Sequence, residues 1–324
     1  MDETHDSNLK SWVNIDENSD FPIQNIPFGI YSPKEGGDLH VATAIGNYVL
    51  DLAYLDEAGI FEGTEVEGTE VFHEPTLNAF MSMGRKAWKD TRKVISQILN
   101  ENDGTLRDNK ELKDLALVPV ENAEMEFPVD IGDYTDFYSS KEHASNVGTI
   151  FRGPENALMP NWLHLPIAYH GRASSVVLDG ADIVRPKGQT KAPDAKSPSF
   201  GDSKRMDFEL EMGLFIGAGN RLSEPVSVDD AEDHIFGMAL VNDWSARDIQ
   251  TWEYQPLGPF LAKNFATTIS PWIITLEALE PFRCKGPKQD PEPLEYLRNN
   301  KDSTFDINLG IYLKSKKMDS YDLI

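Results

Sequence analysis

The stretch RMDFELEMGLF, residues 205–215, alternates acidic and apolar side chains in the manner of a β-strand. Asp207, Glu209 and Glu211 take every second position, and apolar residues fill the positions between them. Because successive side chains of a strand point to opposite faces, the three carboxylates share one face, spaced roughly 6.5–7 Å apart. In a half-buried site each neighbouring pair would repel by about 2–2.5 kcal/mol at an effective dielectric of ~20. The pattern predicts β-structure and requires an explanation for the acids.

Two interpretations of the acidic face compete. Alternating acids usually form the solvated face of an antiparallel sheet, since Asp and Glu are easily hydrated there. Alternatively the acids bind a cation, because divalent ions such as Ca²⁺ and Mg²⁺ take carboxylate oxygens from separate chain segments. Acids and reactive groups elsewhere in the chain must decide between the two.

The composition excludes several classes of protein. The chain has 324 residues, 40% hydrophobic and 26% charged, which is enough for two domains with a sizeable core. Its formal net charge of −24 repels phosphate backbones and anionic lipid, so we expect neither nucleic-acid nor membrane binding. An anionic small substrate would need local Arg or Lys.

Cysteine usage and the N-terminal sequence favour a soluble, cytoplasmic protein. Cys284 is the single cysteine, so neither an internal disulfide framework nor a thiolate zinc site is possible. The first twelve residues lack the features of a secretory signal, and no apolar run approaches the ~20 residues of a membrane span.

The chain divides near residue 127, into regions 1–127 and 128–324. In the first region we expect short strands within residues 26–55, with a hairpin turn at Gly46-Asn47, and helical spacing of apolar residues over 76–100. The second region is rich in short strands, Gly and Pro, which predicts a mostly-β catalytic domain, a sandwich or roll. It contains no G-x-S-x-G elbow, P-loop or H-E-x-x-H motif.

Residues 134–148, YTDFYSSKEHASNVG, supply the first group of polar candidates. Ser139 and Glu142 would form a capping box that begins a short helix, which Gly148 can end. The residues gathered around this helix entry are Asp136, Tyr138 and His143. In isolation a solvated histidine and an ordinary turn-forming Asp are equally good interpretations.

Residues 240–254, LVNDWSARDIQTWEY, supply the second group. A strand should end near Asp243, and Ser245 would cap a following helix. Four polar residues spaced four, three and four apart would share one helix face: Asp243, Arg247, Gln250 and Tyr254. Such a face is usually solvated, but neighbouring tryptophans indicate partial burial.

The third segment, residues 256–272, carries Lys263 in an apolar and hydroxyl-rich run. The lysine is either a surface side chain with a buried stem or a buried cation aimed at developing negative charge. Together the segments offer four oxygen ligands: Asp136, Glu209, Glu211 and Asp243. With an imidazole and several cations nearby, this set suits metal-assisted hydrolysis of an anionic carbonyl compound.

Three long runs, residues 131–175, 207–217 and 234–272, closely resemble the fumarylacetoacetate hydrolase family, and the resemblance covers nearly the whole chain. It implies a mainly β (α+β) fold. An SH3-like β-barrel over residues 1–127 would precede a mixed β-sandwich roll over residues 128–324, within a homodimer.

The resemblance also implies a site. Ca²⁺ or Mg²⁺ would be held by Asp136, Glu209, Glu211 and Asp243, with Lys263 and Thr267 around the same ion. Substrate contacts would come from Tyr138, Arg152, Tyr169, Gln250 and Tyr254. Asp207 would be a bystander or an outer partner.

The implied reaction is hydrolysis of a carbon–carbon bond in the diketo acid 4-fumarylacetoacetate. It yields fumarate and acetoacetate, the last step of tyrosine and phenylalanine catabolism. The ion would act as a Lewis acid on the diketone and His143 as the base that activates water. Arg247, Gln250 and Lys263 would stabilise the oxyanion and the leaving carbanion.

The sequence departs from the family pattern in one respect. Family members continue beyond the equivalent of residue 324 with closing strands, a glutamate that orients the catalytic histidine and a substrate-binding threonine. We therefore expect the catalytic domain to be incomplete at its C-terminus. The alternatives are a relative acting on another acylpyruvate and a truncated, inactive homologue that binds a divalent ion or a partner.

Overall fold

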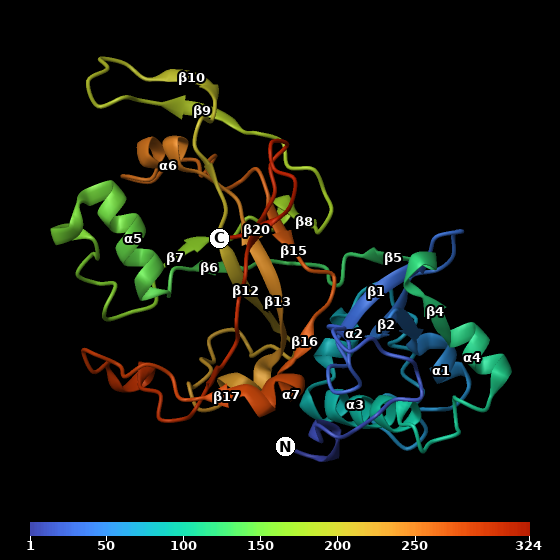
Figure 1. The fold of residues 1–324 in the computed structure, drawn as a ribbon. Coiled ribbons are helices and arrows are strands. Elements are labelled where there is room, and N and C mark those ends of the chain that lie inside the picture. The colour runs from blue at the N-terminus through green and yellow to red at the C-terminus, as the bar shows by residue number, and fades with distance from the viewer.

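A computed structural model describes all 324 residues, and its fold is mixed α+β and rich in strands (Figure 1). The N-terminal region is built on an antiparallel sheet in the order β4-β3-β2-β1-β5. Its strands are β1 (Phe28–Pro33), β2 (His40–Ile45), β3 (Tyr48–Asp51), β4 (Leu117–Pro119) and β5 (Ala123–Glu126). Gly46 and Asn47 form the predicted two-residue turn, and Gly46 takes the positive φ, 55°, that such turns require.

Four helices accompany this sheet: α1 (Leu52–Glu57), α2 (Asn78–Ser82), α3 (Arg85–Leu99) and α4 (Lys110–Ala116). The helical spacing predicted over residues 76–100 is therefore divided between α2 and α3. The break falls at Gly84, whose φ of 86° lies in the left-handed region that ends a helix. Asp51 begins α1 by accepting hydrogen bonds from the backbone N–H groups of Ala53 and Tyr54.

The main apolar core lies almost entirely in this region. It is a cluster of 29 buried residues, of which only Val129, Phe236 and Ile273 come from beyond residue 127. Phe236 stacks against Phe28 and Trp88, with ring centroids 5.8 and 5.1 Å away. The two regions thus share one packed interface.

The second region is organised around a central sheet in the order β12-β13-β15-β8, with β16 also paired to β13. These strands are β8 (Val176–Leu178), β12 (Leu210–Ile216), β13 (Ile235–Asp243), β15 (Thr267–Ile269) and β16 (Ile274–Thr275). Two-stranded ladders surround the sheet: β6 (Thr135–Phe137) with β7 (Ala168–His170), β9 (Lys187–Thr190) with β10 (Ser199–Asp202), β11 (Met206–Asp207) with β14 (Ser245–Ala246), β17 (Arg283–Cys284) with β18 (Thr304–Phe305), and β19 (Tyr312–Leu313) with β20 (Asp322–Leu323).

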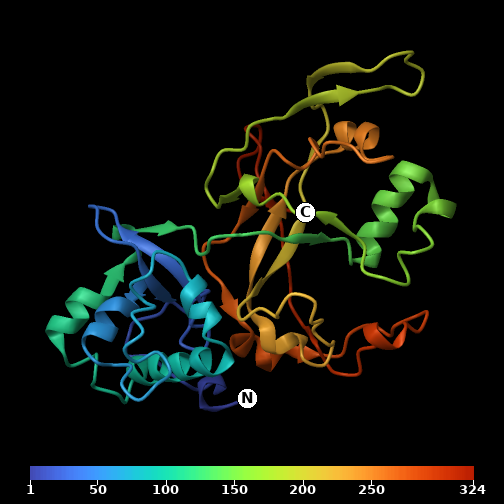
Figure 2. The same ribbon diagram turned by 180° about the vertical axis from the view of Figure 1, so that it is seen from behind.

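The helices of this region are α5 (Lys141–Arg152), α6 (Arg247–Glu253) and α7 (Leu276–Leu279). Both α5 and α6 lie on the side of the β12–β13 pair that faces away from the N-terminal region, as the front and rear views show (Figures 1 and 2). Short 3₁₀ helices cover Glu3–His5, Val120–Asn122, Pro154–Asn156, Ala173–Ser175, Ala231–His234, Glu280–Phe282 and Glu295–Leu297. None of the helices combines the length and the apolar composition that crossing a bilayer requires.

Several local predictions were wrong. The acidic stretch is not one strand, because Phe208 and Glu209 lie between β11 and β12. Helix α5 is capped by Ser140, whose hydroxyl accepts from the N–H of His143, and not by the box predicted from Ser139 and Glu142.

The predicted stop at Gly148 was also wrong, since α5 continues to Arg152 and ends at Gly153, with φ 84°. A Cβ on Gly148 would lie 1.8 Å from the carbonyl oxygen of Ala157, so this glycine permits a close approach. Ser245 does not cap α6; it lies in β14, and Ala246 precedes the helix without a side-chain cap.

Candidate active site

Three of the predicted acids converge at the edges of separate strands. Asp136 lies on β6, Glu211 on β12 and Asp243 at the end of β13. One carboxylate oxygen from each lies within 4.8 Å of the others. Carboxylates gathered at this spacing repel one another unless a cation lies between them.

Glu209 lies beside this group rather than within it. Its carboxylate contacts Lys263 Nζ at 2.5 Å, Arg247 Nη2 at 2.6 Å and His143 Nε2 at 3.2 Å. Burial alone would raise its pKa, but the hydrogen bond from His143 and the charges of Lys263 and Arg247 lower that pKa well below its usual range. Glu209 is thus held as an anion by its own neighbours.

Lys263 is a buried cation, only 4% exposed, and not a surface side chain. Its Nζ donates to Asp243 Oδ2 at 2.7 Å as well as to Glu209. Burial favours the neutral amine, but the charges of Asp243 and Glu209 prevail and raise the pKa of Lys263. Thr267, which pairs with Asp243 across β15 and β13, donates from Oγ1 to Asp243 Oδ1 at 3.2 Å.

Arg172 is a site residue that the sequence analysis missed. Its Nη1 donates to Asp136 Oδ2 at 2.7 Å, and its Nη2 donates to both oxygens of Asp243 at 3.0 and 3.1 Å. The residue is only 8% exposed. No periodicity marks it in the sequence; the one available signal was a cation two residues after the end of the short strand β7.

Charges alternate along the site. Its carboxylates are Asp136, Asp207, Glu209, Glu211 and Asp243, and its cations are Arg172, Arg247 and Lys263. Five ionised acids facing three cations leave a formal excess of two negative charges.

One of these two charges belongs to Glu211, which has no hydrogen-bond or ion-pair partner in the protein. Burial, together with the nearby charges of Asp243 and Glu209, raises the pKa of its carboxyl to about 8. A divalent cation would compensate this excess, so the donor set fits an oxygen-ligated divalent ion.

The polar residues of 240–254 are divided between a strand and a helix. Asp243 ends β13, so the prediction that it shares a helix face with Arg247 was wrong. Within α6, Arg247 Nη1 donates to Gln250 Oε1 at 3.0 Å, and Arg247 Nε donates to Asp207 Oδ2 at 2.8 Å. Of the two roles expected for Asp207, the structure favours the outer partner, because Asp207 holds the arginine that also binds Glu209.

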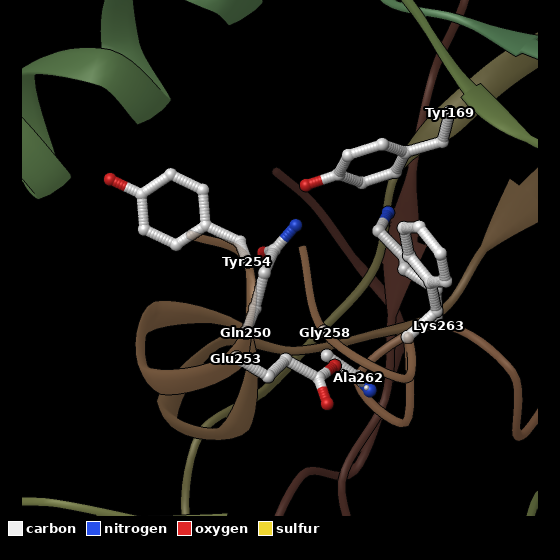
Figure 3. Close-up of a pocket in the computed structure, with 8 residues that line it drawn as sticks. Tyr169, Gln250, Glu253, Tyr254, Gly258, Ala262 and Lys263 are labelled. Atoms are coloured by element: carbon white, nitrogen blue, oxygen red, sulfur yellow. Dashed lines mark hydrogen bonds between the residues drawn. The ribbon is translucent and has the colours of Figure 1, made fainter. Parts of the chain in front are cut away.

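A small cavity opens beside these charges (Figure 3). It is lined by Tyr169, Gln250, Glu253, Tyr254, Gly258, Phe260, Ala262 and Lys263. The hydroxyl of Tyr169, the amide of Gln250 and the amine of Lys263 point toward its centre (Figure 3). Burial raises the pKa of Tyr169, so its hydroxyl stays a hydrogen-bond donor at neutral pH.

Helix α5 brings His143 to the site from the other side. The imidazole stacks edge-on against the ring of Tyr138, with centroids 5.5 Å apart, and its side chain is 34% exposed. Phe151 of the same helix contacts Tyr254 beside α6, with ring centroids 5.4 Å apart. A water molecule can reach His143 while one imidazole nitrogen faces Glu209.

Arg152 makes no hydrogen bond or ion pair with the other candidates, although its charge acts on Tyr138 and opposes the rise of the Tyr138 pKa that burial causes. It ends α5, and its guanidinium donates to the carbonyl oxygens of Asn156 and Ala157 at 3.0 and 2.6 Å. It would have to release these carbonyls to bind a substrate carboxylate.

The chain is similar to known proteins over nearly its whole length. Residues 24–128 match the family described as "Fumarylacetoacetase N-terminal", and residues 133–316 match "Fumarylacetoacetate (FAA) hydrolase C-terminal". The chain is 52% identical over 312 residues to fumarylacetoacetase of Dictyostelium discoideum, covering 96% of this chain and 73% of that one.

Fumarylacetoacetases of other organisms are as similar. The enzyme of Caenorhabditis elegans is 54% identical over 94% of this chain, and that of Homo sapiens 52% over 95%, each with 73% of its own length covered. The solved structure of fumarylacetoacetate hydrolase from Exiguobacterium antarcticum aligns with a TM-score of 0.42 at 13% identity, covering 78% of this chain and 68% of that one.

Proposed function

The chain belongs to the fumarylacetoacetase family and hydrolyses a carbon–carbon bond of fumarylacetoacetate, and on that premise we propose how its own residues do so. The observation that carries the proposal is the group of three carboxylates beside buried Lys263. The family is divalent-metal dependent, and the acidic group fits such an ion. We propose Ca²⁺ or Mg²⁺, held by Asp136, Glu211 and Asp243 with Glu209 and Thr267 alongside.

When bound, the ion supplies Lewis-acid chemistry at the diketone oxygens. His143 takes a proton from water. Its Nε2 lies 3.2 Å from Glu209 Oε1, so the tautomer that carries hydrogen on Nε2 leaves Nδ1 free to accept that proton. Glu209 thereby orients the base while remaining ionised.

The cations and the amide stabilise the charge that develops as the bond breaks. Lys263 and Arg247 both contact Glu209, and Gln250 accepts a hydrogen bond from Arg247. All three side chains can donate to an oxyanion or to the departing acetoacetate. Preorganised donors in a site that excludes water are effective because they need no rearrangement during the reaction.

Substrate binding is assigned to the aromatic residues around the cavity and to Arg152. Tyr169 and Tyr254 line the cavity, and Tyr138 lies against His143. Arg152 would grip a substrate carboxylate as a two-donor fork, which is how an acidic protein can hold an anion.

The experiment is to follow the diketone absorbance of fumarylacetoacetate after adding the purified chain, with Ca²⁺ or Mg²⁺ and with chelator. Metal-dependent loss of absorbance is expected. A parallel assay with other acylpyruvates separates this activity from that of a relative with another substrate. A folded chain that leaves fumarylacetoacetate intact with either ion would contradict the proposal and favour an inactive, ion-binding homologue.

Three further features belong to the same proposal. We propose a homodimer, tested by light scattering of the purified chain. We propose a domain boundary near residue 127, tested by limited proteolysis. We propose a cytoplasmic location, which the single cysteine, Cys284, favours and which cell fractionation tests.

A further inference from the structure

We propose that Arg172 is a positioning residue that sets the separation of Asp136 and Asp243 for the divalent ion. The inference rests on the proposed metal site and adds a role for a residue that touches neither the cavity nor His143. Its basis is the network of contacts around one buried guanidinium.

No backbone ladder connects the two aspartates. Asp136 lies on β6, which pairs only with β7, whereas Asp243 lies on β13, which pairs with β12, β15 and β16. Their relative position therefore depends on side chains. Arg172 spans the gap with one nitrogen on Asp136 and the other on Asp243, at 2.7 and 3.0 Å.

Arg172 is itself held firmly. Gly171 lets its chain pass so close to β6 that an added Cβ would lie 1.9 Å from the carbonyl oxygen of Tyr134. The ring of Tyr134 lies under the guanidinium, 5.7 Å from its carbon atom. The buried Nε has no partner, so the two aspartates provide all of the hydrogen bonding of this guanidinium.

Charge and position predict opposite effects on ion binding. A cation beside the site repels a divalent ion, so if Arg172 acted only through its charge, removing it would tighten binding. If Arg172 acts by position, losing the fork lets Asp136 move away from Asp243, and binding weakens. Lysine keeps the charge but presents a single point donor, which cannot bridge two carboxylates as the planar fork does.

The test is calorimetric titration of the full chain with Ca²⁺ and, separately, with Mg²⁺. For both Arg172→Lys and Arg172→Gln we expect the dissociation constant to rise by about 10–100-fold, the usual cost of losing an outer partner of metal ligands. The matched control is Arg283→Gln, because Arg283 also joins two acids, Glu280 and Glu232 at 2.7 and 2.8 Å, outside the site. Its ion affinity should be unchanged.

Unaltered affinity in Arg172→Lys, or tighter binding in Arg172→Gln, would overturn the positioning role. If neither variant folds, Tyr134→Leu carries the test, since it loosens the guanidinium without changing any charge. Its affinity should fall while that of Tyr134→Phe, which keeps the ring, stays at the wild-type value; an unaffected Tyr134→Leu would overturn the role. A wild-type chain that binds neither ion would instead contradict both the proposed metal site and the positioning role of Arg172.

Discussion

The two regions of the chain fill their interiors with opposite chemistry. The N-terminal region buries aromatic and aliphatic side chains in one cluster of 29 residues. The catalytic region has a small apolar cluster of three buried residues near α6, and it encloses a network of alternating acids and cations. Apolar burial stabilises a fold, whereas buried charges are costly and are retained where they do chemistry. Stability and activity should therefore respond to substitutions in different regions.

The largest expected effect is on activity, at His143. Replacing it with alanine removes the base that activates water and should lower kcat by about 10²–10⁴-fold, the usual contribution of such a base. Ion affinity should persist, because His143 is not a ligand. Steady-state rates and calorimetry measure the two quantities, with the exposed His164→Ala as control. A variant that still turns over normally would remove His143 from the mechanism.

The next largest effect is on stability, in the N-terminal core. Phe72 is fully buried, with its ring 4.8 Å from Phe61 and 5.4 Å from Phe80. Phe72→Ala should lower the free energy of unfolding in urea by about 3–5 kcal/mol through lost burial and a cavity. Phe200→Ala, at a position 73% exposed, is the matched control and should change little. If Phe72→Ala instead lowered the activity per folded molecule, the claim that stability and activity respond to substitutions in different regions would be contradicted.

A third effect distinguishes the acids of the site. Glu211→Gln removes the carboxylate that has no partner in the protein. Losing an outer partner of a metal ligand lowers ion affinity by roughly 10–100-fold, and losing this ligand itself should lower it by at least as much. Glu209→Gln should weaken ion binding less, because three neighbouring groups already hold that carboxylate, and it should lower activity as well. Asp202→Asn, at an exposed acid outside the site, is the control, measured by the same titration, and its ion affinity should be unchanged. Unaltered affinity in Glu209→Gln would show that Glu209 contributes nothing to ion binding.

The smallest expected effect is a pH dependence of the stability of the N-terminal region. The hydrogen bond between His40 Nδ1 and Asp51 Oδ2, at 2.7 Å, raises the pKa of His40 in the folded protein against the opposing effect of burial. Its stabilisation is fully present below the unfolded pKa of about 6.5 and is lost as pH rises through the higher folded pKa. Urea midpoints measured from pH 6 to 9 should fall more for the wild type than for His40→Gln. Parallel curves would show that the pair contributes nothing.

Local patterns predicted the features that local physics determines. The period of two in residues 205–215 identified the acids and the strand character of β11 and β12, although not the break at Phe208 and Glu209. A two-residue Gly-Asn turn identified a hairpin. Residue chemistry also pointed to Lys263 as a possible buried cation. These predictions needed no knowledge of distant partners.

The remaining features depend on contacts between distant segments. Arg172 lies 36 residues from Asp136 and 71 from Asp243, so no spacing rule connects them. The helix face assigned to Asp243 was wrong because β13 continues through that residue and α6 begins only at Arg247. That Glu211 is the acid without a partner, and so carries uncompensated charge, followed only from the packed arrangement.

The most direct test of the account is to measure rate and ion binding on one scale of free Ca²⁺ concentration. The rate of fumarylacetoacetate loss and the calorimetric saturation of the site should rise together, with half of the maximal rate at the dissociation constant. Chelator should abolish both. A rate that persists in chelator, or that saturates at concentrations far from the dissociation constant, would contradict a catalytic ion at the group of carboxylates formed by Asp136, Glu211 and Asp243.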